Sequence, residues 1–339
     1  MFELSEEKEK KALAIHRKAT IVDAHSDRIM ALMPEEPYID LHSGVKVPRI
    51  TFEKHINDLV EGGIKCQIFP VWVSPLFDPI ALKRALLMIE KFSSETAKFR
   101  ERIEPCTNFT EIEKATRSGK IAAVLSLEGG ESLMGDLGIL RIFHRLGVRL
   151  LGFTQLPRNQ LADGSGEFRS RGGLTDFGAE VVKEMNRLNM IVDVSHLNEK
   201  GFWDALELSK TTTIASHSNC KALCDHHRNL TDDQIRAIAD KEGVIGITFQ
   251  EPFLRKDSEN VTIKDVLDHI DYISKLVGAE YIGIGSDYMG LIPSKIKGLE
   301  DIMQLPNLTR GMVARGYSEH DIENILGGNF LRVFKKVLK

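Results

Sequence analysis

The sequence has few cysteines and no long apolar segment. Its four cysteines, Cys66, Cys106, Cys220 and Cys224, are scattered over 339 residues, which favours reduced thiols over a disulfide framework and predicts a cytoplasmic location. No stretch approaches the roughly 18 consecutive apolar residues of a membrane-spanning helix. The segment Met1–Ala19 is rich in Glu and Lys, so it lacks the apolar centre of a secretory signal. We therefore expect no membrane anchor.

The sequence also lacks an excess of charge of either sign. It holds 45 Lys and Arg residues and 49 Asp and Glu residues, which gives a net charge of −4. This charge is too small to predict a nucleic acid or an anionic membrane as partner. A hydrophobic content of 42% and a charged content of 28% are typical of a soluble globular protein with a sizeable core.

Short apolar runs alternate with helical segments along most of the chain. The predicted strands are 20–24, 64–73, 121–127, 149–154, 190–195, 212–216, 244–249 and 281–286. Eight alternating strand and helix units predict an α/β fold, a (β/α)₈ TIM barrel of the metal-dependent hydrolase type. A doubly wound open sheet is the alternative, but it needs a glycine-rich phosphate loop after an early strand, and Asp23–Asp27 is not one.

Additional helices are predicted at both ends of the barrel. Residues 1–19 contain an amphipathic N-terminal helix, and 299–339 contain three short helices separated by Gly and Pro. We therefore expect a single barrel domain over 1–339, with the terminal helices packed on it. The segment 28–50 has several prolines and little periodicity, which predicts a long functional loop after the first strand.

Polar side chains follow six of the predicted strands at the point where each strand ends. Such positions meet at one mouth of a barrel. They are His25 and Asp27, Glu128, Gln155, His196, His217 and Asp287.

Each of these residues alone has an ordinary structural explanation. A histidine after a strand is more often hydrogen-bonded than metal-bound, Glu128 could cap a helix, and Asp287 could belong to a turn. Together they place three imidazoles and three carboxylates at one mouth. The carboxylates would repel one another there unless cations were bound.

The number of donors suggests two divalent ions that share one carboxylate. The favoured assignment gives one ion His25, Asp27 and Glu128, and gives the other Glu128, His196 and His217. Nitrogen and oxygen donors without cysteine suit two Zn²⁺, although Mn²⁺ or Co²⁺ would also fit. Two adjacent ions can hold a bridging hydroxide whose pKa is lowered toward neutrality.

Two further residues are then candidates for substrate chemistry. Asp287 lies outside the metal donors of this assignment and is placed to transfer a proton. Arg228 follows the sixth predicted strand and either binds a substrate carboxylate or is a surface arginine. An alternative zinc site at Cys220 and Cys224 with the neighbouring histidines is disfavoured, because structural zinc usually needs closer ligand spacing.

The sequence resembles the membrane dipeptidase (renal dipeptidase) family of zinc hydrolases. The matching segments span nearly the whole chain in the order of the family: 22–27, 126–129, 147–149, 193–196, 215–219, 228–232, 283–287 and 327–334. The resemblance implies a binuclear zinc barrel of amidohydrolase type that cleaves dipeptides and forms a homodimer. It assigns His25 and Asp27 to one zinc, Glu128 as the bridge, His196 and His217 to the other zinc, Arg228 to the substrate carboxylate, and Asp287 to proton transfer.

One position departs from the family pattern. Where the dipeptidases carry a substrate-contacting histidine after the fourth strand, this chain has Gln155, which can donate a hydrogen bond but cannot be cationic. Arg158 has two interpretations, either as the source of that charge or as a surface residue. The membrane attachment implied by the family name is not carried over.

Three functions follow from these residues. The first is a metal-dependent dipeptidase that hydrolyses the peptide bond through a metal-bridged hydroxide. The second is the same site acting on another amide or ester, such as an N-acyl amino acid or a lactone, which Gln155 leaves open. The third is a non-catalytic metal- or peptide-binding protein.

Overall fold

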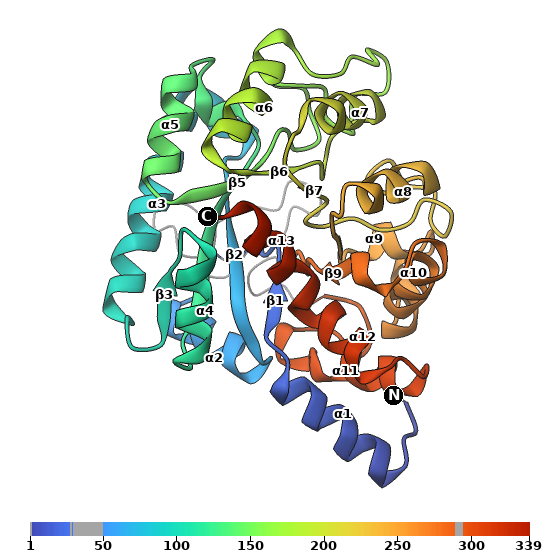
Figure 1. Cartoon of the computed structure of the whole chain (residues 1–339). Coiled ribbons are helices and arrows are strands. Elements are labelled where there is room, and N and C mark those ends of the chain that lie inside the picture. Colours follow the sequence, from blue (N-terminus) through green and yellow to red (C-terminus); the bar gives the residue numbers. More distant parts are fainter. Residues whose placement is uncertain (1, 28, 30–49, 289–293) are drawn as a thin grey trace.

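The computed structural model describes residues 2–27, 29, 50–288 and 294–339 and has the predicted barrel at its centre. Within these residues, eight parallel strands lie in the order β7-β6-β5-β4-β2-β1-β9-β8 (Figure 1). A parallel bridge from Ala215 to Ile245 joins the two ends of this order, so the barrel is nearly closed. The strands are β1 (Ile21–Asp23), β2 (Ile64–Trp72), β4 (Ile121–Glu128), β5 (Val148–Gly152), β6 (Ile191–Asp193), β7 (Thr213–Ile214), β8 (Ile245–Ile247) and β9 (Ile282–Ile284).

One more strand, β3 (Ile103–Pro105), pairs with β4 outside this order of eight, and the sequence did not predict it. It pairs with Ile121–Ala123, the beginning of β4, whereas β5 pairs with Leu125–Glu128, the end of the same strand. The two neighbours therefore share one side of β4. On its other side, β4 pairs with β2 along seven positions, from Cys66 with Ala122 to Trp72 with Glu128.

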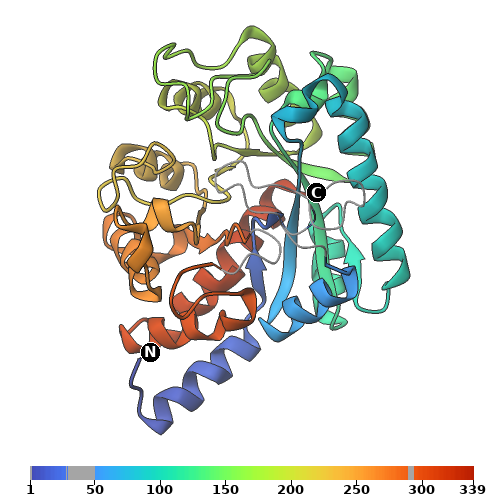
Figure 2. The same ribbon diagram turned by 180° about the vertical axis from the view of Figure 1, so that it is seen from behind.

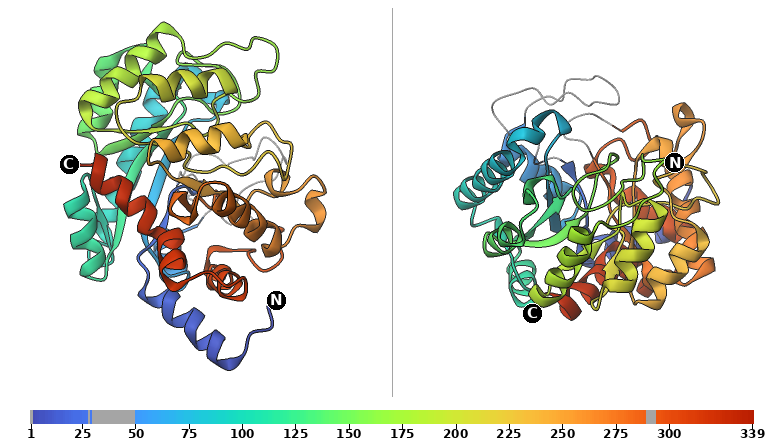
Figure 3. Two further views of the ribbon diagram at one scale, coloured as in Figure 1. Left: turned by 45° about the vertical axis from the view of Figure 1, so that its right-hand side comes forward. Right: turned by 90° about the horizontal axis from the view of Figure 1, so that it is seen from above.

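Helices surround the strands on the outside (Figures 2 and 3). Several begin at a side chain that accepts a hydrogen bond from the first turn, such as Thr51 before α2 and Asn198 before α7. The helices between the strands are α2 (Phe52–Glu61), α3 (Ala81–Lys98), α4 (Phe109–Arg117), α5 (Leu137–Arg145), α6 (Asp176–Leu188), α7 (Glu199–Leu208), α8 (Asp232–Asp240), α9 (Glu251–Leu254) and α10 (Ile263–Leu276). The apolar faces of these helices and the strands form one large buried cluster.

The helices at the two ends of the chain lie together at one side of the barrel (Figure 1). They are α1 (Glu6–Lys18), α11 (Pro306–Ala314), α12 (Glu319–Glu323) and α13 (Asn329–Val337). Gly327, before α13, approaches the start of β1 so closely that a Cβ atom there would lie 2.0 Å from the carbonyl oxygen of Thr20. Phe330 and Phe334 of α13 then join apolar side chains of the strands in a second buried cluster.

The fold class and the eight strands expected from the sequence are confirmed. The main differences are β3 and α4, which the sequence pattern did not predict, and the last predicted helix, which is divided by a π-helical turn at Asn324–Gly328. The predicted functional loop 28–50 lies almost entirely outside the described residues. None of the helices in the described part of the chain is both long and apolar enough to cross a membrane.

Candidate metal centre

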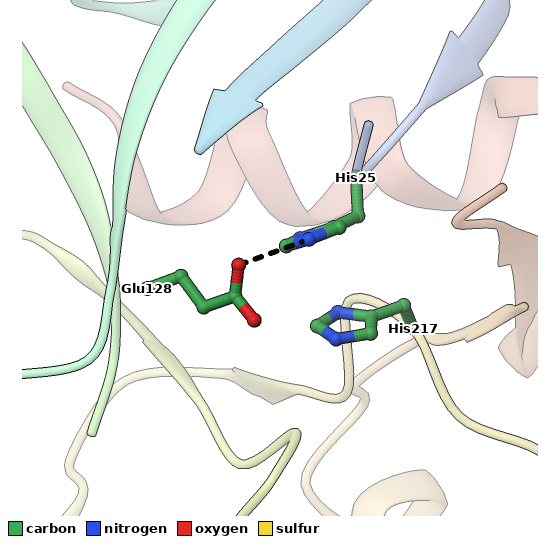
Figure 4. Close-up of side chains that lie close together, drawn as sticks. All are labelled: His25, Glu128 and His217. Atoms are coloured by element: carbon green, nitrogen blue, oxygen red, sulfur yellow. Dashed lines mark ion pairs between the residues drawn. The ribbon is translucent and has the colours of Figure 1, made fainter. Parts of the chain in front are cut away.

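Five strands deliver the predicted metal donors and Asp287 to one end of the barrel. Glu128 is the last residue of β4, and the other residues follow the ends of β1, β6, β7 and β9 within two to four positions. Figure 4 shows His25, Glu128 and His217 converging from three separate strands. The side chains of all three are buried, with at most 8% of each residue exposed. The expectation that these strand ends meet is therefore fulfilled in the geometry.

Glu128 lies between two groups of histidine nitrogens. Its Oε2 atom is 3.3 Å from Nε2 of His25, and its Oε1 atom is 3.1 Å from Nε2 of His196. The Nε2 atoms of His196 and His217 are 2.8 Å apart. Each oxygen of one carboxylate thus faces a different histidine, which is the arrangement expected of a bridging ligand.

Two further carboxylates approach His25 from the other side. The Nε2 atom of His25 lies 3.6 Å from Oδ1 of Asp27 and 3.8 Å from Oδ1 of Asp287. Two groups of three residues each bring their donor atoms within 4.8 Å of one another. One group is His25, Glu128 and His217, and the other is His25, Asp27 and Asp287. His25 belongs to both groups.

These residues fit divalent cations on two observations. First, Nε2 of His25, Oε2 of Glu128 and Nδ1 of His196 are buried without a hydrogen-bond partner in the described structure, which is costly for polar atoms. Second, the donor set consists of imidazole nitrogens and carboxylate oxygens, which suits Zn²⁺ and similar ions.

Burial and neighbouring charges shift the pKa values of the donors. Burial lowers the pKa of His217 well below its usual value, and the nearby His25 and Arg228 charges lower it further, so this imidazole is neutral and able to bind a metal. Burial alone would raise the pKa of Glu128, but His25 and His196 outweigh it and hold that pKa well below its usual range. Glu128 is therefore ionised.

A chain of hydrogen bonds orients His217. The Ser216 hydroxyl donates to Oδ2 of Asp193, so it can only accept from the Nδ1–H of His217, at 2.8 Å. The Nε2 atom of His217 is then left without a proton and faces the centre. Asp193 also accepts from the backbone amides of Ser195 and Ser216, which fixes the carboxylate between β6 and β7.

Asp23 and Ser286 repeat this arrangement between β1 and β9. Oδ1 of Asp23 accepts from the amide of Ser286, and Oδ2 accepts from its hydroxyl, at 2.8 and 2.7 Å. Burial raises the pKa of Asp23 to about 6, against the opposing effect of these hydrogen bonds. The roles of these serines were not predicted from the sequence, although β1 and β6 share the letters Ile-Val-Asp and a serine directly precedes both His217 and Asp287.

Asp287 is held at the edge of the centre by its backbone. Its φ of 59° is rare for a residue with a side chain, and His196 has a similar φ of 68°. The amide of Asp287 donates to the carbonyl of His25, and the Thr248 hydroxyl donates to Oδ2. Burial raises the pKa of the Asp287 carboxyl, and the nearby Asp27 and Glu128 carboxylates raise it further. This carboxyl can therefore hold a proton close to neutral pH.

Arg228 is buried beside the centre, with 3% of the residue exposed, so it is not a surface arginine. Its Nη2 donates to the carbonyl of His217 at 2.8 Å, and its guanidinium lies 5.5 Å from the ring of Phe253. Burial lowers the pKa of Arg228 to about 10, which leaves it cationic at neutral pH. Arg228 and His196 both line a cavity of about 690 Å³, so a cation and a metal donor face the same space.

Gln155 and Arg158 occupy the loop after β5. The side-chain oxygen of Gln155 accepts a hydrogen bond from the amide of Leu156, at 2.5 Å. The Arg158 side chain is 54% exposed and paired with Asp163. The structure thus gives Arg158 a structural partner.

The cysteine alternative fails. The thiol of Cys220 donates to the carbonyl of His269, and that of Cys224 donates to the carbonyl of Pro252. Among the residues that the structure describes, no group of metal-donor atoms includes a cysteine.

Comparison with known proteins gives the same family over nearly the whole chain. The family model described as membrane dipeptidase (peptidase family M19) matches residues 9–339. The chain is 31% identical to Dipeptidase 3 of Mus musculus, over 96% of this chain and 66% of the mouse protein. It is 37% identical to Dipeptidase tcpJ of Claviceps purpurea, over 70% of this chain and 56% of that protein. The chain thus spans between about half and two thirds of the length of these relatives.

Solved structures agree with this result. A metallopeptidase from Rhodobacter sphaeroides, liganded with a phosphinate mimic of the dipeptide L-Ala-D-Ala, is 28% identical, with a TM-score of 0.82 over 94% of this chain and 99% of the other. The structure described as the dipeptidase AC, a metallopeptidase of family M19, is also 28% identical, with a TM-score of 0.84 over 94% and 99% of the two chains. The family implies a divalent metal, which the donors around Glu128 fit. The chain belongs to the membrane dipeptidase family, peptidase family M19.

Proposed function

We propose that this protein is a metal-dependent dipeptidase. The observation that carries the proposal is the buried Arg228 beside the donor cluster around Glu128, because a dipeptide presents a carboxylate close to its scissile bond. The Rhodobacter sphaeroides relative of similar fold is liganded with a dipeptide mimic, which supports the same substrate class here.

Two Zn²⁺ ions are the proposed cofactors, with Mn²⁺ or Co²⁺ as substitutes. His25, Asp27 and Glu128 would hold one ion, and Glu128, His196 and His217 would hold the other. Bound ions of this kind lower the pKa of water toward neutrality and polarise a carbonyl group. The two oxygens of Glu128, which face His25 and His196 separately, support its role as the shared ligand.

The remaining steps are assigned to side chains of this chain. Arg228 binds the C-terminal carboxylate of the dipeptide through its guanidinium. Asp287 takes a proton from the attacking water and delivers it to the leaving amine, a role that its raised pKa supports. The amide hydrogens of Gln155 donate to the developing oxyanion in place of a histidine.

Metal analysis together with a substrate panel tests the proposal. We expect close to two divalent ions per chain and hydrolysis of dipeptides, including some with a D-residue at the C-terminal position. Preferred hydrolysis of N-acyl amino acids or lactones would instead make the protein a hydrolase of another amide or ester. Fewer than about one ion per chain, with no activity after Zn²⁺ is added, would indicate a binding protein.

We also propose a cytoplasmic location. The four cysteines are all free and buried, which supports a reducing compartment. Measuring the free thiols of the protein purified without reductant tests this point, with four expected per chain.

A further inference from the structure

Two exposed aromatic side chains line the cavity that Arg228 and His196 also line. Phe168, in the loop between β5 and α6, is 69% exposed, and Trp203 of α7 is 36% exposed. Among the large apolar residues of the described chain, Phe168 has the highest exposure. Single exposed apolar residues are common, but two aromatic rings in one cavity form an apolar surface that a bound ligand can cover.

Phe168 is positioned by the loop that carries it. On one side of it, the amide of Glu167 donates to the carbonyl of Gly164 at 3.0 Å. On the other side, the amide of Gly172 donates to Oδ2 of Asp163 at 2.8 Å. The exposed ring therefore belongs to a hydrogen-bonded loop, which gives its backbone a defined position beside the cavity.

Ring contacts support both aromatic side chains. The Phe168 ring meets the ring of His227 edge to face, with centroids 5.2 Å apart and an interplanar angle of 89°. His227 lines the same cavity and directly precedes Arg228 in the chain. The Trp203 ring packs edge to face against the ring of buried Phe202, with centroids 5.0 Å apart. These contacts hold the two rings in place before a ligand binds, which lowers the cost of binding.

The charges around the cavity nearly balance. Apart from Arg228, five charged residues line it: Arg171, Lys200, Lys221, Glu167 and Glu199. Two of these cations have carboxylate partners, because Lys200 is paired with Asp204 and Lys221 lies 3.7 Å from Asp225. The cavity wall therefore favours neither an acidic nor a basic side chain strongly, and the aromatic rings decide what it prefers.

We propose that this cavity is the subsite for the side chain of the C-terminal residue of the dipeptide, and that Phe168 and Trp203 select an aromatic side chain there. The inference rests on the proposed dipeptidase function. The C-terminal carboxylate and this side chain leave the same Cα atom, so a carboxylate bound to Arg228 places the side chain in the space that Arg228 shares with Phe168. Cavities of about 300–1,000 Å³ hold drug-sized ligands, so about 690 Å³ has room for an aromatic ring.

Steady-state kinetics of the metal-loaded, full-length protein tests the proposal. The substrates are Ala-Phe, Ala-Ala and Ala-Glu, each with an L- and with a D-residue at the second position. We expect kcat/KM for Ala-Phe to exceed that for Ala-Ala and Ala-Glu at least about tenfold, for one enantiomer or both, because apolar side chains discriminate by about this factor in a matching pocket.

Phe168→Ala should lower the ratio of kcat/KM between Ala-Phe and Ala-Ala at least about fivefold, because the lost ring contacts only the larger side chain. Phe168→Tyr keeps the ring and should keep the ratio. Ile142→Ala is the matched control, since it removes an apolar side chain of α5 that is 46% exposed and lies outside the lining of this cavity. Far-UV circular dichroism confirms that each variant folds.

Isothermal titration calorimetry with free phenylalanine and free alanine measures the subsite without turnover. We expect phenylalanine to bind the metal-loaded wild type at least about tenfold more tightly than alanine, and Phe168→Ala to remove this difference. Equal kcat/KM for Ala-Phe and Ala-Ala, faster turnover of Ala-Glu, or an unchanged ratio in Phe168→Ala would overturn the inference while dipeptidase activity stands. Phenylalanine binding that depends on Phe168, without hydrolysis of any dipeptide, would support the subsite and overturn the proposed activity.

Discussion

Ser216 is the side chain through which Asp193 acts on His217. Its hydroxyl donates to Asp193 and accepts from His217, so it decides which imidazole nitrogen carries the proton. In Ser216→Ala this link is lost, and Nδ1 of His217 faces a carboxylate without an intermediate donor. Changes of this kind behind a metal ligand typically cost 10- to 100-fold in metal affinity.

We therefore expect Ser216→Ala to bind Zn²⁺ about 10- to 100-fold more weakly, measured by competition with a chromophoric chelator. Ser216→Thr keeps the hydroxyl and should recover most of the affinity. Ser93→Ala, on the partly exposed side of α3, serves as the control for loss of an ordinary serine. Unchanged affinity in Ser216→Ala would contradict the role assigned to this hydrogen-bond chain.

Asp287 is predicted to act in turnover and not in metal retention. Asn has the same shape and can still accept from Thr248, but it cannot carry a proton between water and the leaving amine. We expect Asp287→Asn to keep the metal content of the wild type while kcat for a dipeptide falls at least about 100-fold, the lower end for positioned acid–base groups. Full activity in this variant would exclude the proton-transfer role.

The sequence predicted those site residues whose place is determined by the residue type and by its position directly after a strand. His25, Glu128 and His217 each follow an apolar run, and a parallel barrel brings such positions together whatever the details of packing. Asp193 and Ser216 were missed because their roles arise from a contact between two neighbouring strands. The place of the Gln155 side chain likewise depends on the loop conformation, which sequence periodicity does not fix.

Among the strands too, those with a clear local sequence pattern were predicted, and the one that depends on a long-range contact was not. β2 and β4 are long apolar runs and were predicted nearly to the residue. β3 is three residues long and contains Pro105. It pairs with the beginning of β4, on the side where β5 pairs only with the end of that strand. No local pattern marks such a strand, since its hydrogen bonds come from a partner about 18 residues away in the sequence.

α1 is attached to the C-terminal helices by a buried histidine, which makes this attachment sensitive to acid. The carbonyl of Gly62 accepts from Nε2–H of His16, so Nδ1 accepts from the Thr309 hydroxyl of α11. In this neutral arrangement a hydroxyl donor faces Nδ1, which opposes a second proton there. Burial lowers the pKa of His16 from 6.5 to about 4.

The sign of the pH effect follows from these pKa values. Between pH 6.5 and about 4 the unfolded chain binds a proton at His16 that the folded chain does not, so acid favours unfolding. The stabilising effect of neutral His16 is present above pH 6.5 and is lost as the pH falls. At pH 5 this loss is about 2 kcal/mol relative to pH 7.

His16→Gln removes the titration and keeps a donor for Gly62. We expect the drop in the free energy of unfolding between pH 7 and pH 5 to be about 2 kcal/mol smaller in this variant than in the wild type, measured by urea denaturation at both pH values. Comparing the two proteins cancels the other groups that titrate in this range. An equal drop in both would show that His16 is protonated in the folded state.

Metal binding is predicted to stabilise the barrel as a whole. The proposed donors lie at or after the ends of β1, β4, β6 and β7, so bound ions connect strands that are distant in the sequence. Without ions, the carboxylates of Asp27, Glu128 and Asp287 stay close together and repel one another. Saturation of one site at about 1,000 times its dissociation constant adds about 4 kcal/mol to the stability, so two sites add about 8 kcal/mol.

If the 339 residues unfold together, unfolding entropies of about 2.1 cal/mol/K per residue convert the energy of two sites into a Tm shift of roughly 11 °C. We propose that residues 1–339 form one cooperative unit, because α1 from the start of the chain packs with α11 and the α13 side chains share a buried cluster with the strands. Differential scanning calorimetry should then show one transition that moves down by about 11 °C after chelation and returns when Zn²⁺ is added. Two transitions, of which only one responds to metal, would instead divide the chain into a barrel that holds the centre and a separate unit of terminal helices.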